Sequence, residues 1–120
     1  MRPARSIMSQ TKSDLRTQHC QPCKPGTPAL RSEEVAKLLK SLNGWAYADG
    51  VIQREFKFKN FHETMAFVNA VAFIANREDH HPDLEVGYNK CLVKFSTHSV
   101  GGLSQNDFIC AAKVDALLAD

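Results

Sequence analysis

Three of the chain's five histidines lie in the segment EDHHPDLEVGYNKCLVKFSTHS, residues 78–99. His80 and His81 are adjacent and precede a proline, and His98 stands near the far end of a run in which apolar and polar residues alternate. Histidine gains and loses a proton more readily near neutral pH than any other side chain, so a group of imidazoles is suited to proton transfer. The segment is therefore the first candidate for a catalytic site.

The residues between these histidines predict an antiparallel hairpin with Asn89 and Lys90 as its loop. In this register His81 lies directly opposite His98, about 5 Å away, with His80 beside them. One face of the hairpin then turns toward the helices and carries Leu84, Val86, Tyr88, Val93 and Phe95. The open face carries His81, Asp83, Lys94, Ser96 and His98.

Three interpretations of the histidines remain open. Three imidazoles suffice for a catalytic zinc ion, but neighbours in an extended chain point to opposite sides, so His80 and His81 chelate one ion poorly. The histidines could instead be structural and bond backbone groups. Proton transfer on a small polar molecule fits best, because packing does not require imidazoles on an open sheet face.

Asp107 has two possible roles, since it stands three residues after Ser104, where it could cap a helix or assist the site.

The elements that must position this segment can be predicted from periodicity and caps. A helix follows Ser32, a hairpin turns at Asp49 and Gly50, and a second helix follows Asn60, with Glu63 completing a capping box. The second hairpin comes next, and then the helix after Ser104. The order α-β-β-α-β-β-α indicates an α+β fold, a four-stranded antiparallel sheet with helices packed on one face.

The predicted helix after Asn60 is apolar over a wide arc. Its apolar residues form two stripes, Phe61, Met65, Val68, Ala72 and Ala75 on one, and Phe67, Val71 and Ile74 on the other. One stripe can cover the sheet and the second can meet a partner chain, so we expect a homodimer or homotetramer. The alternative is that the helix is simply the central core helix of a monomer.

Composition and charge indicate one domain, residues 31–120, preceded by a flexible tail over residues 1–30. Residues 1–31 hold six basic side chains and one acidic side chain, and the remainder is mildly acidic. Because the positive charge falls in the expected tail, no direct nucleic-acid binding is expected.

The sequence shows no long apolar run and no secretory signal, so we expect a cytoplasmic protein without a membrane segment. Deletion of residues 1–29 is expected to leave folding and turnover nearly intact.

Two of the four cysteines, Cys20 and Cys23, belong to the motif HCQPC in the expected tail. The motif offers three metal ligands, whereas a structural zinc site normally needs four and no second such pair follows. The cysteines do not form the pattern of a disulfide framework. No structural zinc site is therefore expected at this motif.

The segment also resembles the pterin-4a-carbinolamine dehydratases. The pattern of that family is His-His-Pro, an aromatic residue, a histidine and a downstream aspartate, here His80-His81-Pro82, Tyr88, His98 and Asp107, with matching spacing. The similarity extends from about residue 44 to the C-terminus. The chain departs from the pattern at Asn76, where a glutamate is usual.

The resemblance implies a hydro-lyase that removes water from 4a-hydroxytetrahydropterin to give quinonoid dihydropterin, in support of tetrahydrobiopterin regeneration for aromatic amino-acid hydroxylation. It implies that the catalytic residues are His80 and His98, as acid and base, and His81, which orients or polarises the pterin. The implied reaction needs neither a metal nor an organic cofactor. The substrate contacts that it implies are His80, His81, Pro82, Thr97, His98, Ser99 and Asp107. Relatives of this fold also serve as dimerisation cofactors or assembly factors, so a non-catalytic binding module is the alternative function.

Overall fold

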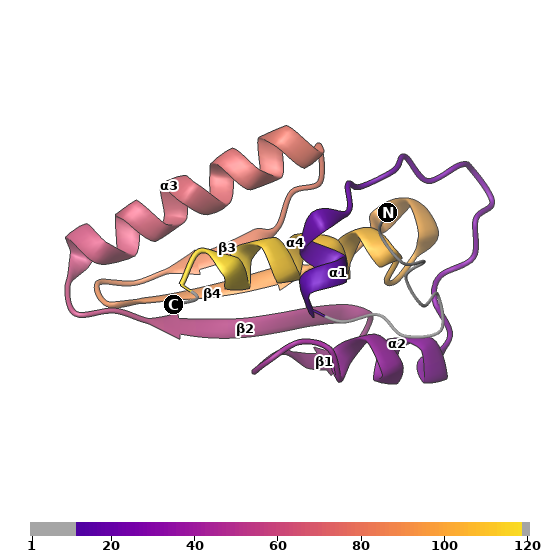
Figure 1. Ribbon diagram of the computed structural model, residues 1–120, viewed down its shortest axis with the longest axis horizontal. Helices are drawn as coiled ribbons and strands as arrows, with labels where there is room; N and C mark the ends of the chain where they lie inside the picture. Colours follow the sequence, from indigo (N-terminus) through magenta and orange to yellow (C-terminus); the bar gives the residue numbers. More distant parts are fainter. Residues whose placement is uncertain (1–11, 119–120) are drawn as a thin grey trace, which may run out of the picture.

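The sheet of this protein has four antiparallel strands, as the sequence predicts. The computed structural model describes residues 12–118. The strands are β1 (Ala46–Ala48), β2 (Val51–Lys57), β3 (Asp83–Val86) and β4 (Lys90–Phe95), and they lie in the order β1-β2-β4-β3. Helices α2 (Ser32–Leu39), α3 (Phe61–Glu78) and α4 (Gln105–Ala116) complete the predicted order (Figure 1). The α+β fold class is therefore confirmed.

Local sequence signals explain where these elements begin and turn. Asp49 and Gly50 have φ angles of 51° and 77° between β1 and β2, the left-handed conformation that a two-residue hairpin turn requires. The Asn60 side chain accepts a hydrogen bond of 3.0 Å from the backbone N–H of Glu63 and so caps α3. Both features were predicted from the sequence.

The hydrophobic core lies between one face of the sheet and the helices. Buried residues on this sheet face alternate along β2 and β4, and the core residues of the two strands are Ile52, Phe56, Cys91, Val93 and Phe95. From α3 the core receives Phe67 and Val71, and from α4 it receives a nearly continuous buried run that includes Phe108 and Val114. Residues of the opposite sheet face, such as Glu55, remain exposed. The helices thus cover one face, as the alternation predicts.

The register of the second hairpin differs from the sequence prediction. Val86 pairs with Cys91 and Asp83 with Lys94, and the N–H of Gly87 donates to the Lys90 carbonyl over 2.8 Å. The tight loop is therefore Tyr88-Asn89, one residue earlier than expected, and every pairing moves by two residues. Because side chains alternate with a period of two, an even shift leaves the residues of β3 and β4 on their predicted faces, whereas Tyr88, expected to face the helices, lies in the exposed loop.

The predicted pairing of His81 with His98 is consequently wrong. β3 begins only at Asp83 and β4 ends at Phe95, so neither histidine belongs to the ladder. His98 instead opens a short 3₁₀ helix, η1 (His98–Val100). The segments that flank the strands, and not the strand ladder, therefore position these histidines.

The N-terminal segment differs from the tail expected over residues 1–30. Residues 1–11 lie outside the described part, but residues 12–17 form helix α1 (Lys12–Thr17), which packs against α4 (Figure 1). Leu15 has no exposed surface and belongs to the core. The backbone N–H of Leu30 donates to the Leu103 carbonyl over 2.9 Å. One fully buried leucine in a short polar helix is too weak a periodic signal to be recognised in the sequence.

Replacement of Leu15 by alanine is expected to lower the free energy of unfolding by about 2–4 kcal/mol, because it removes fully buried apolar surface and leaves a cavity. Chemical denaturation would measure the change. The matched control is Leu118→Ala, since Leu118 is 50% exposed and its truncation should change stability little. Equal unfolding midpoints for the two variants would contradict the packing of α1 in the core.

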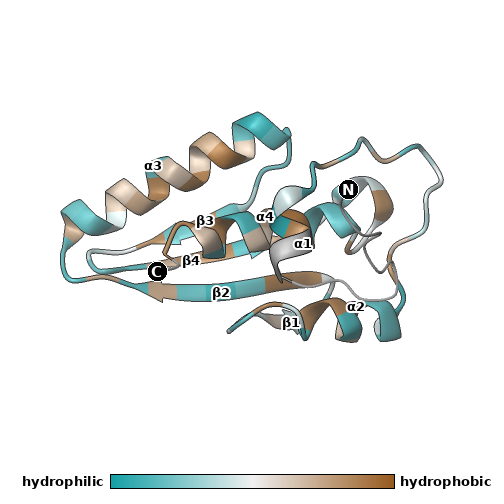
Figure 2. Ribbon diagram, in the orientation of Figure 1, coloured by the Kyte–Doolittle hydropathy of each residue, from teal (hydrophilic) through white to brown (hydrophobic). Residues whose placement is uncertain are grey.

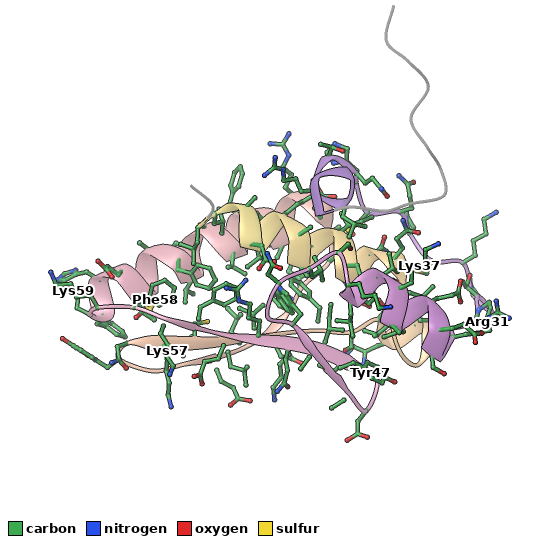
Figure 3. All side chains as sticks on the ribbon, turned by 60° about the horizontal axis from the view of Figure 1, so that its bottom comes forward. Arg31, Lys37, Tyr47, Lys57, Phe58 and Lys59 are labelled. Carbon is green, nitrogen blue, oxygen red and sulfur yellow. The ribbon has the colours of Figure 1, made fainter. Side chains whose placement is uncertain are left out.

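The labelled basic side chains divide between two ends of the molecule, with Arg31 and Lys37 at one end and Lys57 and Lys59 at the other (Figure 3). Among residues 12–118, no helix combines the length and the apolar character that a membrane crossing demands.

Candidate active site

The end of α3 determines the position of His80. The helix ends at Glu78, and Asp79 follows with a φ of 51°, the left-handed conformation that commonly terminates a helix. The backbone N–H of His80 still donates to the Ala75 carbonyl, over 3.1 Å. Pro82 then prevents a return to helix. The His80 imidazole is thereby directed back from the helix end toward α4.

His80 and Asp107 form the shortest polar contact of the site. The Nε2 atom of His80 lies 2.6 Å from Oδ1 of Asp107, whose side chain is fully buried. Oδ2 of the same carboxylate accepts hydrogen bonds from the Thr97 hydroxyl at 2.7 Å and from the Ser104 backbone N–H at 2.9 Å. The ring of His80 also stacks on Phe95, with 6.0 Å between centroids. These contacts compensate the burial of the carboxylate and fix the imidazole plane.

The position of Asp107 is compatible with both of the roles that the sequence left open. It completes the capping box of α4 with Ser104, and it also contacts His80. Engagement of Nε2 leaves Nδ1 as the His80 ring nitrogen that can exchange a proton with a substrate. The Thr97 hydroxyl lies 2.8 Å from that of Ser104, which links the β4 end to the helix cap.

The loop after β4 presents the other predicted residues. The N–H of Thr97 donates to the Gly102 carbonyl over 2.8 Å, and this bond closes a tight loop from which His98 and Ser99 project into solvent. His98 lines a cavity of ≈ 310 Å³ together with Asp49 and Gly50. His80 and Ser99 line a second cavity of ≈ 290 Å³. Thr97 lines both cavities.

The structure thus brings together part of the predicted set. His80, Thr97, Ser99 and Asp107 belong to one cluster, and His98 lines a second cavity that shares Thr97 with it. His81 is exposed, and its Nε2 lies 3.0 Å from Oδ1 of Asn76 on the last turn of α3. Pro82 is half-buried beside it.

Sequence reasoning missed several residues of the ≈ 290 Å³ cavity, called the His80 cavity below. Its lining includes residues 20–23 from the expected tail, as well as Glu78 and Asn106. The motif HCQPC was conspicuous in the sequence, but nothing there indicated which part of the fold it contacts. Glu78 and Asn106 carried no signal beyond their closeness in sequence to His80 and Asp107.

Metal-ligating side chains are not clustered within the described residues. Over residues 12–118, no group of three or more histidine, cysteine, aspartate or glutamate side chains has the arrangement to hold a metal ion. Cys20 lies 3.5 Å from Cys110, sulfur to sulfur, and both thiols are free. Cys20 of the HCQPC segment thus packs against α4.

Comparison with known proteins places this geometry in a family. The sequence model described as pterin 4 alpha carbinolamine dehydratase matches residues 28–117, three quarters of the chain. The chain belongs to the pterin-4a-carbinolamine dehydratase family. The resemblance seen in the His-His-Pro segment is thereby confirmed.

Curated relatives of this dehydratase family align over almost the whole chain. A candidate pterin-4-alpha-carbinolamine dehydratase of Nitrosospira multiformis is 57% identical over 110 residues, which cover 92% of this chain and 97% of the relative. One from Nitrosomonas eutropha is 60% identical over 106 residues, covering 88% and 94%. Both alignments are longer than the residues matched by the family model, so they include part of the segment before residue 28.

Two solved structures share the dehydratase fold. A transcriptional coactivator/pterin dehydratase from Brucella melitensis superposes with a TM-score of 0.73 at 34% identity, covering 76% of this chain and 99% of that one. A pterin dehydratase-like protein identified as a RuBisCO assembly factor superposes with a TM-score of 0.53 at 21% identity, covering 63% and 88%. The second similarity concerns the fold alone.

One residue of the family pattern, Tyr88, lies far from the others in the structure. Tyr88 stacks on Phe61, with 6.4 Å between ring centroids, at the start of α3, whereas His80 follows the end of the same helix. An 18-residue helix is about 27 Å long, so Tyr88 does not share the His80 cavity. Asn76, the departure from the family pattern, contacts His81 and is therefore close to the cluster.

We expect Asn76→Glu to move the pH profile of turnover upward, because a carboxylate beside His81 favours the protonated imidazole. The pH dependence of kcat/KM would measure the shift. The control is Asn69→Asp, which adds a negative charge at an exposed position elsewhere on α3. If both variants show the wild-type profile, His81 takes no part in the titration that governs turnover.

Proposed function

We propose that the protein is a hydro-lyase that converts 4a-hydroxytetrahydropterin to quinonoid dihydropterin. Membership of the dehydratase family and the names of relatives at 57% and 60% identity support the reaction. The observation that carries the proposal to this chain is the contact of 2.6 Å between His80 and the buried Asp107, at the edge of a cavity. The physiological role would be regeneration of tetrahydrobiopterin for aromatic amino-acid hydroxylation.

The reaction requires two proton transfers. A proton delivered to the 4a-hydroxyl lets the C4a–O bond break and water leave, while the N5 proton goes to a base and its electron pair completes the C4a–N5 double bond. The protons balance, so no redox partner, metal or organic cofactor is consumed. Two groups of suitable acidity on the same substrate are sufficient.

His80 and His98 supply these groups in the proposal. Asp107 holds the tautomer and orientation of His80 and stabilises its protonated form, as a carboxylate does when it is hydrogen-bonded to an imidazole. His98 is exposed and lines the cavity that shares Thr97 with the His80 cavity, where a bound substrate could reach it. His81 orients the pterin, and Pro82, Thr97 and Ser99 provide further contacts.

The test is a direct assay of carbinolamine dehydration with the purified protein. The proposal expects catalysis above the spontaneous rate, and catalysis that survives prolonged incubation with a strong chelator. Activity lost to the chelator and restored by zinc would replace proton transfer by a metal mechanism. A folded protein with no activity would favour the binding-module function on the same fold.

We also propose that the protein is a homodimer or homotetramer that associates through α3. The middle of this helix is hydrophobic between hydrophilic ends (Figure 2), and Phe73 and Phe61 are 64% and 48% exposed. Exposed apolar side chains of this size are typical of an interface. Light scattering at micromolar concentration is expected to give at least twice the monomer mass, and Phe73→Asp should lower it. A monomer mass for the unmodified protein would contradict the proposal.

A further inference from the structure

We propose that residues 19–23, called the strap, form a wall of the substrate cavity, and that Glu78 and Asn106 are positioning residues that hold the strap in place. The substrate's identity rests on the proposed function. The strap contains the HCQPC motif, and the proposed chemistry gives no other role to Glu78 and Asn106.

Glu78 is the first anchor of the strap. Its side chain is only 3% exposed, and Oε1 accepts a hydrogen bond of 2.8 Å from the Cys20 backbone N–H. Oε2 lies 3.0 Å from Nδ1 of His19 and 3.8 Å from Nζ of Lys113. Burial opposes ionisation, but the bonds from Cys20 and His19 and the charge of Lys113 lower the pKa of Glu78 below its ordinary value of 4.5. The anchor is thus a carboxylate at neutral pH, with charge-assisted bonds to the strap.

Asn106 is the second anchor. Its Oδ1 accepts a hydrogen bond of 3.0 Å from the Gln21 backbone N–H, and its Nδ2 donates one of 2.7 Å to the Gln21 carbonyl. One side-chain amide therefore binds both backbone groups of Gln21, as a neighbouring β-strand would. Two bonds in opposite directions fix the orientation of the strap as well as its distance from α4.

A third contact lies behind the strap, where Cys20 meets the fully buried Cys110 at 3.5 Å between sulfur atoms. The hydrogen bond with Cys20, together with burial, raises the pKa of Cys110, which therefore remains a thiol at neutral pH. This contact between the two sulfur atoms packs the strap against α4.

The anchors stand next to the proposed acid–base pair in the sequence. Glu78 precedes His80 by two residues, and Asn106 immediately precedes Asp107. The strap and the His80–Asp107 pair are therefore fixed on the same two helix ends. Residues 20–23 line the His80 cavity together with His80, Thr97 and Ser99. At ≈ 290 Å³ the cavity is near the lower end for small-molecule sites, so a bicyclic substrate that reaches His80 must also contact the strap.

Truncation of the chain through residue 23 is an unsuitable test, because it removes the core residue Leu15 together with the strap. Asn106→Ala removes the two bonds to Gln21 and the contact of 3.8 Å between Nδ2 and Cys23 Sγ. It should raise KM for the carbinolamine by roughly tenfold, with kcat within about twofold of the wild-type value. Asn106→Asp keeps the acceptor for the Gln21 N–H but sets a carboxylate oxygen against the Gln21 carbonyl, so its KM should also rise above the wild-type value. The matched control is Asn69→Ala, at an exposed position on α3.

An unchanged KM in Asn106→Ala, at a temperature where the variant is folded, would overturn the proposal. A lower melting temperature with an unchanged KM would show that Asn106 is structural only.

A second measurement does not depend on turnover. Cys23 lines the His80 cavity, so a stable, fully oxidised pterin at ten times its Kd should slow alkylation of Cys23 by iodoacetamide about tenfold. Mass spectrometry of the labelled peptide would report the rate. Protection of Cys23 without dehydratase activity would disprove the proposed function and support the proposal that the strap forms a wall of the cavity. Dehydratase activity with no protection of Cys23 and an unchanged KM in Asn106→Ala would support the proposed function and disprove the role of the strap.

Discussion

Replacing His80 or His98 with alanine is expected to lower kcat/KM for carbinolamine dehydration by about 100- to 10,000-fold, because each variant lacks one positioned acid or base. The double variant should lose less than the product of the two single losses, since both groups serve one transition state. Steady-state kinetics, corrected for the spontaneous reaction, would measure each value. His62→Ala is the matched control, an exposed histidine on α3.

The two histidine variants should differ in stability. His98 is exposed, so its replacement should leave the free energy of unfolding nearly unchanged. His80→Ala leaves Oδ1 of the buried Asp107 without its 2.6 Å partner, and it should cost about 1–3 kcal/mol. If both variants are folded and keep wild-type turnover, the histidines are not the proton-transfer groups and the proposed mechanism fails.

Asp107→Asn is expected to lower kcat/KM by about 100-fold or more, because a neutral amide no longer stabilises a protonated His80 or fixes its tautomer. The substitution also replaces an acceptor that receives bonds from Thr97 and Ser104, so it should reduce the free energy of unfolding by about 1–3 kcal/mol. Kinetics and denaturation measured on the same preparation would separate the two effects.

Ser104→Ala distinguishes the catalytic contribution of Asp107 from its cap. It removes the capping hydroxyl, at a cost of about 1 kcal/mol, and leaves the contact between His80 and Asp107 in place. This variant should therefore lose stability with little loss of turnover. If Asp107→Asn behaves in the same way, the carboxylate is a helix cap and no more.

The fold was predictable where a local signal fixes the geometry. Asn60 and Ser104 mark helix starts, and Asp49-Gly50 marks a turn, because each depends on residues within a few positions. The loop of the second hairpin was misplaced by one residue, since Tyr88-Asn89 and Asn89-Lys90 are both acceptable turns. The residues of β3 and β4 were still assigned to the correct faces of the sheet, because the register was shifted by an even number of residues.

The site was predictable only in part. The residues His80, His98 and Asp107 could be found from their types and spacing, but the contact of His80 with Asp107 joins a helix end to another helix start and has no local signature. The strap was missed for the same reason. Its anchors lie 58 and 85 residues further along the chain, and only tertiary packing brings them together.

This separation has a consequence for the order in which the molecule is completed during synthesis. Cys20 precedes its partner Cys110 by 90 residues, and Arg16 precedes Lys113 by 97. At roughly 5–20 residues per second, the ribosome makes α4 several seconds after the strap. Until then α1 and the strap have no surface to dock on, and Leu15 stays in water. The substrate cavity therefore gains its wall only when α4 emerges, and a nascent chain stalled before α4 would carry His80 without Asp107 and without the strap in place.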